Sequence, residues 1–181
     1  MNSLITAIAD KALELGASAV GTVAVPDVVF NTQFRKICAR NQCGTYGKSY
    51  MCPPDCGEIE DLIAKLKAYE TAVVYQTVGT LEDSFDAEGM AEWGNKHHKL
   101  VLALTRFLLA GGFRDFVNLA GGGCHLCPQC GKVTGEPCRH PDLAISAMSA
   151  HGIDVSALAA RAGMKYINGQ NTVTYFGAVF L

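Results

Sequence analysis

Residues 59–78 read IEDLIAKLKAYETAVVYQTV, and they predict a helix that leads directly into a strand. Ile59, Leu62, Ile63 and Leu66 have the i, i+3, i+4, i+7 spacing that places apolar side chains on one face of an α-helix. Residues 71–78 are rich in Val, Thr and Tyr, which favour strands. A helix followed by a strand is the repeating unit of an α/β fold.

The same succession of helix and strand is predicted elsewhere along the chain. Apolar residues at helical spacing in residues 4–15 end at Gly16, which favours a helix stop, and residues 20–25 are then rich in valine. A long helix is expected over residues 86–110, where one face is apolar, and a strand over residues 113–120. The last third of the chain predicts two helices and a final strand, over residues 141–150, 155–162 and 172–181.

These patterns together predict an α/β fold with about four strands in one sheet, flanking helices and two cysteine-rich metal-binding loops. The loops are expected between the regular elements, in segments rich in Gly and Pro. With 181 residues, of which 49% are hydrophobic, the chain is long enough to bury a core of its own. We expect a single metal-binding domain over residues 1–181, and the order of its strands does not follow from the sequence.

Two segments bear on where the protein is located. Residues 1–15 contain charged residues such as Asp10 and Lys11, where a secretory signal would have an unbroken apolar stretch. The longest apolar run, residues 100–113, is interrupted by Arg106 and is too short to span a bilayer. We therefore expect a soluble, cytoplasmic protein without membrane insertion. Thiols stay reduced in that compartment, so eight cysteines in two sets of four favour metal ligands over disulfides.

The charge of the chain is unevenly distributed. A net charge of −2 favours neither nucleic acid nor a membrane surface as a partner. Residues 35–56 and 124–140 contain the cysteines, and there six basic residues outnumber two acidic ones, so these windows carry +4 and the remainder −6. Nearby cations would stabilise the negative complex that four thiolates form around an iron-sulfur cluster. Chance clustering of surface cations is the alternative explanation.

The second cysteine set has the clearer spacing. It reads Cys124-His-Leu-Cys127-Pro-Gln-Cys130, followed by Cys138-Arg-His-Pro141. Three cysteines separated by two residues each suit three corners of one iron-sulfur cube, whereas structural zinc usually takes two separated pairs. The glycines at 121–123 and at 131 let the backbone approach closely and direct N–H groups at sulfur. We expect a metal at this set, and a [4Fe-4S] cluster in preference to zinc.

The first cysteine set has an unusual spacing, with Cys38 and Cys43 followed by Cys52-Pro-Pro-Asp-Cys56. It matches neither a standard zinc finger nor a standard ferredoxin. Pro53 and Pro54 stiffen the chain after Cys52 and remove two N–H groups that would need partners. The spacing lets Cys56 reach the same metal as Cys52, but it also allows a bystander thiol. Whether Cys56 is the fourth ligand stays open at this point.

Taken together, the motifs show a family resemblance over nearly the whole chain. Cys-x4-Cys-Gly-Thr-Tyr-Gly-Lys-x3-Cys-Pro-Pro is combined with Gly-Gly-x-Cys-x-Leu-Cys-x2-Cys, Cys-Arg-His-Pro and Gly-Ile-Asp-Val, starting at Cys38, Gly121, Cys138 and Gly152. This combination resembles the predicted metal-binding family called domain of unknown function 2284, which is common in anaerobic bacteria and archaea. The family designation implies a metal but no reaction.

The resemblance implies seven metal-binding cysteines, at Cys38, Cys43, Cys52, Cys124, Cys127, Cys130 and Cys138. Cys56 is not a regular member of the family pattern. The chain also departs from the pattern before Gly152, where it has Ala147-Met-Ser-Ala150 and the family more often has Ser-Met-Glu-Ala. Both departures concern how the first site is occupied.

Some other residues are candidates for contact with a bound cluster. Tyr46 and Lys48 lie within the first loop, and Arg139 follows a cysteine of the second set, so each could shield or electrostatically tune a cluster; plain loop packing is the alternative. His125 and His140 flank cysteines and are expected to donate hydrogen bonds near the metal without binding it. For His97 and His98 we expect a structural role within the long helix.

The leading hypothesis is an iron-sulfur protein with one or two [4Fe-4S] clusters that transfers electrons to an unknown redox protein or enzyme. One cluster is expected at Cys38, Cys43, Cys52 and Cys56 and the other at Cys124, Cys127, Cys130 and Cys138. Ligands could cross between the sets, as they do in two-cluster ferredoxins. The alternatives are a zinc-stabilised interaction module and a carrier of clusters or metal. An enzyme is less expected, although a cluster with three cysteine ligands and an open iron would indicate one. The sequence names no substrate, and a homo-oligomer stays open.

Overall fold

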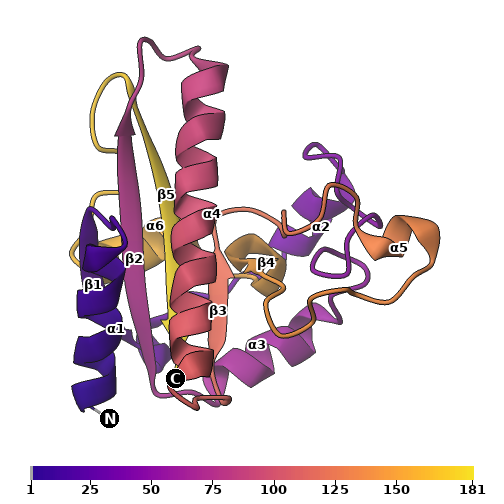
Figure 1. The fold of residues 1–181 in the computed structure, drawn as a ribbon, viewed down its shortest axis with the longest axis horizontal. Coiled ribbons are helices and arrows are strands. Elements are labelled where there is room, and N and C mark those ends of the chain that lie inside the picture. Colours follow the sequence, from indigo (N-terminus) through magenta and orange to yellow (C-terminus); the bar gives the residue numbers. More distant parts are fainter. Residues whose placement is uncertain (1) are drawn as a thin grey trace.

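The computed structural model describes residues 2–181 and has one mixed sheet at its centre (Figure 1). In this part of the chain five strands lie in the order β1-β2-β5-β3-β4. β3 and β4 run parallel, and the other neighbouring pairs are antiparallel. The strands are β1 (Ala19–Ala24), β2 (Thr71–Thr80), β3 (Val117–Ala120), β4 (Ser146–Ala147) and β5 (Thr172–Phe180).

Helices cover both faces of this sheet. α1 (Asn2–Glu14) and α4 (Ala87–Ala110) pack on one face, and α3 (Ile59–Lys67) and α6 (Val155–Arg161) pack on the other. Short 3₁₀ turns, η1 (Val25–Asp27) and η2 (Met148–His151), connect elements on the α3 side. Two short helices, α2 (Phe34–Ala39) and α5 (Gly131–Thr134), belong to the cysteine-bearing segments. Within residues 2–181 no helix is long and apolar enough to cross a membrane.

β2 is the strand around which the core is built. Successive side chains of a strand point to opposite faces, so Val73 and Tyr75 pack with α1 and α4 while Ala72 and Val74 pack toward α3 and α6. All four residues are fully buried. Burial on both faces explains why this strand has a nearly continuous apolar sequence. The ring of Tyr75 is accommodated by Gly177 on β5, where an added Cβ would lie 2.3 Å from the ring.

The α/β class predicted from the sequence is confirmed, with five strands in place of about four. The helix and strand predicted in residues 59–78 correspond to α3 and β2, and the long helix corresponds to α4. The helix predicted over residues 141–150 is wrong, because this segment contains β4 and η2. Ser146 and Ala147 pair with β3, and the Ser146 hydroxyl donates to the Met51 carbonyl at 2.8 Å. These long-range contacts override the local helical pattern.

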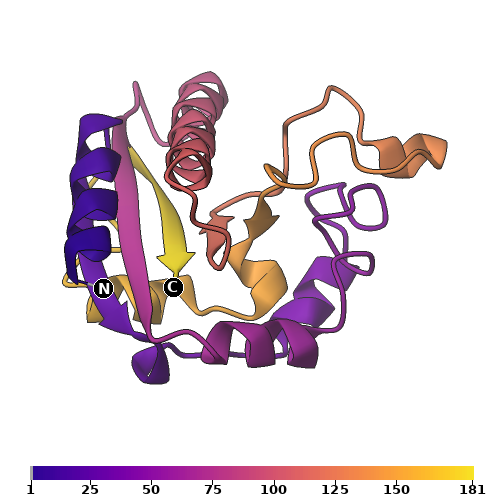
Figure 2. The same cartoon turned by 60° about the horizontal axis from the view of Figure 1, so that its bottom comes forward.

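The two cysteine-bearing segments lie side by side at one end of the molecule. The first leaves β1 and returns through α3 to β2, and the second leaves β3 and returns at β4. Both views place α2 and α5, which belong to these segments, at the end away from α1 (Figures 1 and 2). The expectation that these windows are loops throughout is therefore corrected, since Cys38 lies on α2 and Lys132 lies on α5.

His97 is buried in the interface between α4 and the sheet. Only 2% of its surface is exposed, and its Nδ1 lies 3.0 Å from the Thr77 hydroxyl. Its ring stacks on Tyr175 and lies against Tyr75, with centroid distances of 5.9 and 5.8 Å. Burial lowers the pKa of His97 to about 4, with a small further lowering from His98 and an opposing contribution from the Phe176 carbonyl.

This burial predicts a pH-dependent stability. The unfolded chain binds a proton at His97 near pH 6.5 while the folded protein does not, so the free energy of unfolding should fall from pH 6.5 to pH 4, by about 3 kcal/mol from this residue. His97→Asn should keep a partner for Thr77 and remove this titration. Thermal unfolding of both proteins between pH 7 and pH 4.5 checks the prediction. Burial also lowers the pKa of His151, but this residue is present in both proteins and so does not distinguish them. The same dependence of stability on pH in the two proteins would contradict the prediction.

Candidate metal centre

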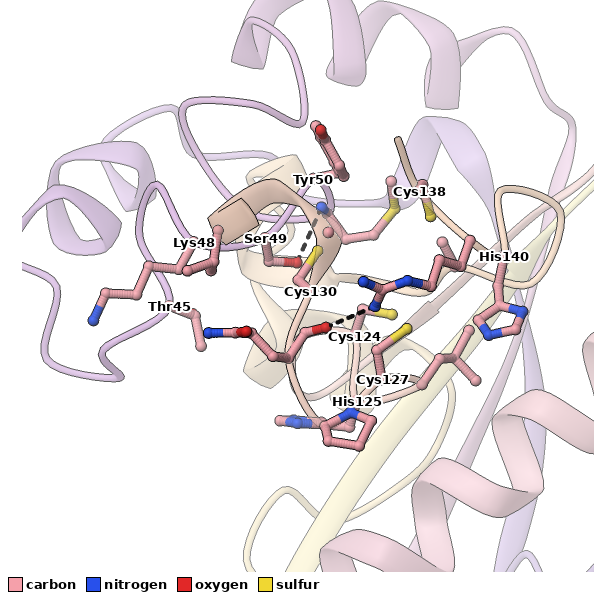
Figure 3. Close-up of a pocket in the computed structure, with 18 of the residues that line it drawn as sticks. Thr45, Lys48, Ser49, Tyr50, Cys124, His125, Cys127, Cys130, Cys138 and His140 are labelled. Carbon is pink, nitrogen blue, oxygen red and sulfur yellow. Dashed lines mark hydrogen bonds between the residues drawn. The ribbon is translucent and has the colours of Figure 1, made fainter. Parts of the chain in front are cut away.

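The cysteines of the second set surround one cavity. Cys124 and Cys127 lie in the segment after β3, Cys130 caps the start of α5, and Cys138 follows α5. All four line a cavity of ≈ 420 Å³, and Figure 3 shows them around it. The cysteines predicted from the spacing as one ligand set are thus brought together by the fold.

The first cysteine segment forms a wall of this second-set cavity. Thr45, Lys48, Ser49 and Tyr50 all line it (Figure 3). Burial raises the pKa of the Cys130 thiol, but hydrogen bonds from the Lys132 and Tyr50 amides and from the Ser49 hydroxyl outweigh burial, so that its pKa is lowered. Donors from the first segment therefore stabilise a thiolate of the second set.

Three cysteines of the first set share a separate cavity of ≈ 300 Å³. Cys38 reaches it from α2, and Cys43 and Cys52 reach it from the following loop. The Thr45 hydroxyl lies 3.1 Å from Cys43 Sγ and 3.5 Å from Cys52 Sγ, so it joins the two thiols. The opposite wall is formed by residues 121–123, and a Cβ added to Gly123 would lie 3.3 Å from Cys52 Sγ. The glycine run therefore serves the first set as well as preceding the second.

The thiols of the first set differ in their tendency to ionise. Burial raises the pKa of Cys38, against the opposing effect of the Arg35 cation. Hydrogen bonds from the Thr45 hydroxyl and amide lower the pKa of Cys43, which is the exposed member of the set. Cys43 is thus more readily deprotonated for metal binding than Cys38.

Cys56 lies close to the other cysteines of the first set but does not line their cavity. The charge of Cys56 contributes to raising the pKa of Cys38, and the charge of Cys52 contributes to raising the pKa of Cys56. The three thiols are therefore neighbours. However, Cys56 lines another cavity, of ≈ 440 Å³, with Lys65, Asn118 and His151. Burial raises the pKa of Cys56, although Arg35 donates a hydrogen bond to its sulfur at 3.4 Å.

Polar contacts join the two cysteine segments. Asp55 forms an ion pair with Lys132 on α5, and the Tyr50 hydroxyl donates to the Glu136 carbonyl at 2.7 Å. With the Ser49 and Tyr50 donors to Cys130, these contacts hold the first segment against α5. The cysteine sets are therefore parts of one assembly. As they stand, no three His, Cys, Asp or Glu side chains within residues 2–181 are grouped to hold a single metal ion.

The remaining candidates are divided between the two cavities. Tyr46 lines the first-set cavity, whereas Lys48 lines the second-set cavity although it belongs to the first loop. Arg139 lines the second-set cavity and pairs with Glu136, and its pKa is raised by Glu136 and by a hydrogen bond to Cys127. His140 also lines the second-set cavity. His98 lies edge-on to His125, with ring centroids 5.5 Å apart.

Sequence reasoning missed several residues of this assembly. Arg35 was counted only as a positive charge, and Thr45 and Ser49 were not considered, although each contacts a cysteine sulfur. Thr45 could have been found, because it lies within the Cys-Gly-Thr-Tyr-Gly motif two residues after Cys43. The contacts of Arg35 and Ser49 connect segments distant in sequence, and no local pattern indicates them.

The fold and the two thiol-lined cavities define an α/β protein that presents the donor groups of a metal site. The sequence profile of the family described as predicted metal-binding protein (DUF2284) matches residues 21–181, and the chain belongs to this family. The match includes both cysteine sets, so the predicted resemblance is confirmed. No curated protein and no solved structure matches the chain.

The ion pair between Asp55 and Lys132 predicts a local change in mobility. Asp55→Asn removes the pair, so amide hydrogens of α5 should exchange faster, by about two- to fivefold for a partly exposed pair. Glu92→Gln is the matched control, since it removes the exposed Glu92–Lys96 pair on α4. Hydrogen exchange read by mass spectrometry should show faster exchange at residues 131–134 in the first variant alone. Unchanged exchange there would show that other contacts hold the segments together.

Proposed function

We propose that the protein binds a [4Fe-4S] cluster at each of the two cavities and acts in electron transfer. The observation that carries the proposal is that each cavity is lined by one cysteine set and that the cavities adjoin. Thr45 and His125 line both. Cys124, Cys127, Cys130 and Cys138 would hold one cluster, and Cys38, Cys43 and Cys52 would hold the other. A bound cluster would supply one-electron transfer at a potential set by its surroundings.

The chemistry of the residues around the thiols supports this assignment. Thiolates are the ligands that iron-sulfur clusters require, and hydrogen bonds to their sulfurs tune the potential. The Lys132 and Tyr50 amides and the Ser49 hydroxyl lower the pKa of Cys130, and Arg139 lies near Cys127. Arg35 and Arg139 place positive charge beside thiols of both sets. These residues would offset the negative charge of thiolate-bound clusters.

The positions of the cavities support electron transfer in particular. A Cβ on Gly123, which directly precedes Cys124 of the second set, would lie 3.3 Å from Cys52 Sγ, so the two cysteine sets lie close together. Cys43 is exposed and the cysteines of the second set are half-buried, which would bring both clusters within reach of a partner. The proposal includes a cytoplasmic, reducing location and a redox protein or enzyme as the partner. A zinc-stabilised interaction module is the rival that the following experiment separates.

The proposal is tested by anaerobic purification followed by assays of iron, sulfide and zinc and an absorption spectrum. We expect about eight irons and about eight sulfides per chain with a brown colour, because each [4Fe-4S] cluster contains four of each. The double substitution Cys124→Ala with Cys127→Ala leaves two thiols in the second set, fewer than the three that we assign to the first cluster, and should lower the content to about four irons. The control Val29→Ala alters an exposed side chain outside both cavities and should keep all the iron.

A different metal content would reject the proposal. Stoichiometric zinc without iron in anaerobically prepared protein would favour the interaction module, since Zn²⁺ has no redox chemistry. About four irons in the unaltered protein would show that only one cavity holds a cluster. In that case the effect of the double substitution at Cys124 and Cys127 identifies the cavity.

A further inference from the structure

The first-set cavity presents three thiols rather than four. Cys38, Cys43 and Cys52 line it together with residues 121–123, but Cys56 does not. The second-set cavity, by contrast, is lined by all four of its cysteines. The two cavities therefore differ in the number of thiols available to a bound cluster.

Arg35 holds Cys56, the cysteine of the first set that does not line this cavity. Its guanidinium donates to Cys56 Sγ at 3.4 Å, to the Gly57 carbonyl at 2.9 Å and to the Ala150 carbonyl at 3.3 Å. Arg35 thus connects three segments: its own helix α2, the turn that precedes α3, and η2. Three bonds from one guanidinium fix its orientation. Turning Cys56 toward the other thiols would break the bond to its sulfur.

Two glycines that line this cavity with the three thiols have backbone amides without a hydrogen-bond partner among the described residues. Among the backbone hydrogen bonds of residues 2–181 outside helices and strands, none uses the amide of Gly122 or Gly123. Neither glycine carries a side chain that would screen its N–H group. Successive free amides on a concave wall favour an anionic ligand. The hydroxyl-bearing residues Thr45, Tyr46 and Ser149 also line this cavity.

The cavity continues toward buried histidines. A second chamber of ≈ 290 Å³ shares Gly122, Gly123 and His125 with the first-set cavity and is also lined by His97 and His98. The Nε2 atoms of His97 and His98 are buried and have no hydrogen-bond partner among the described residues. Buried polar atoms without a partner are costly, and a polar ligand in the chamber would satisfy them.

We propose that the cluster of the first set is bound by Cys38, Cys43 and Cys52 alone, and that its fourth iron binds a small carboxylate in the glycine-lined cavity. The inference rests on the proposed function, because it requires a cluster at this set. One carboxylate oxygen would meet the iron and the other would accept from the amides of Gly122 and Gly123. The polar remainder of the ligand would extend toward His98. This arrangement would make the first set a ligand-binding site.

The ligand count is tested by substitution under anaerobic conditions. Cys56→Ala should keep about eight irons per chain, whereas the matched Cys43→Ala, at an exposed thiol, should fall to about four. If Cys56→Ala also falls to about four irons, Cys56 is a ligand and the inference is overturned. Circular dichroism of each variant establishes that it is folded. Should Cys56→Ala fail to fold, Arg35→Lys serves instead and should likewise keep all its iron.

The open iron is tested by Mössbauer spectroscopy of protein enriched in ⁵⁷Fe, with citrate as the carboxylate probe. Citrate should shift the signal of about one iron in eight, because one iron of one cluster is accessible. Gly122→Leu should keep the iron content and abolish this shift, since a Cβ at Gly122 meets no atom within 4 Å and the larger side chain would fill the cavity.

The outcomes separate this inference from the proposed function. Protein without iron would reject both. Protein with about eight irons and no citrate-sensitive signal would reject only the open site and would leave electron transfer standing. A citrate shift that persists in Gly122→Leu would place the ligand outside the glycine-lined cavity and overturn the inference.

Discussion

The pairing of β2 with β5 is the constraint on which the rest of the structure depends. The ladder runs from Ala72 opposite Phe180 to Thr80 opposite Thr172 and forms the middle of the sheet. β5 then pairs with β3, whose far edge holds β4. Both cysteine segments are connections attached to this framework. Their ends are fixed by strands and helices of the core, so the loops are positioned without a large core of their own.

Around the cysteines, the structure depends on polar contacts in place of apolar packing. Arg35, Thr45 and Ser49 each contact a sulfur, and the Asp55–Lys132 ion pair holds the two segments together. Such contacts suit a site that must hold negatively charged sulfur near the surface, since donors and cations stabilise thiolates. They also give the two cysteine sets different surroundings. Amide and hydroxyl donors lie near Cys130, whereas the sulfur of Cys56 accepts a hydrogen bond from the guanidinium of Arg35.

Much of the framework could be predicted from the sequence because its signals are local. The spacing in residues 59–66 and the β-branched run that follows specify α3 and β2 directly. The segment of β4 could not be predicted, because its conformation depends on pairing with β3. The spacing also indicated which four cysteines line the second-set cavity. The orientation of Cys56 and the place of Lys48 were not indicated, since Arg35 and the fold of the whole first loop determine them.

The central position of β5 also orders events during synthesis. β2 and β3 are neighbours only through β5, so the sheet cannot close before residues 172–180 have left the ribosome. All eight cysteines precede β5 in the chain, so they leave the ribosome before the sheet is complete. Contacts between distant parts of a chain form late, because a long loop must close first. The eight thiols are therefore not held by the completed sheet for the whole interval between their synthesis and its closing.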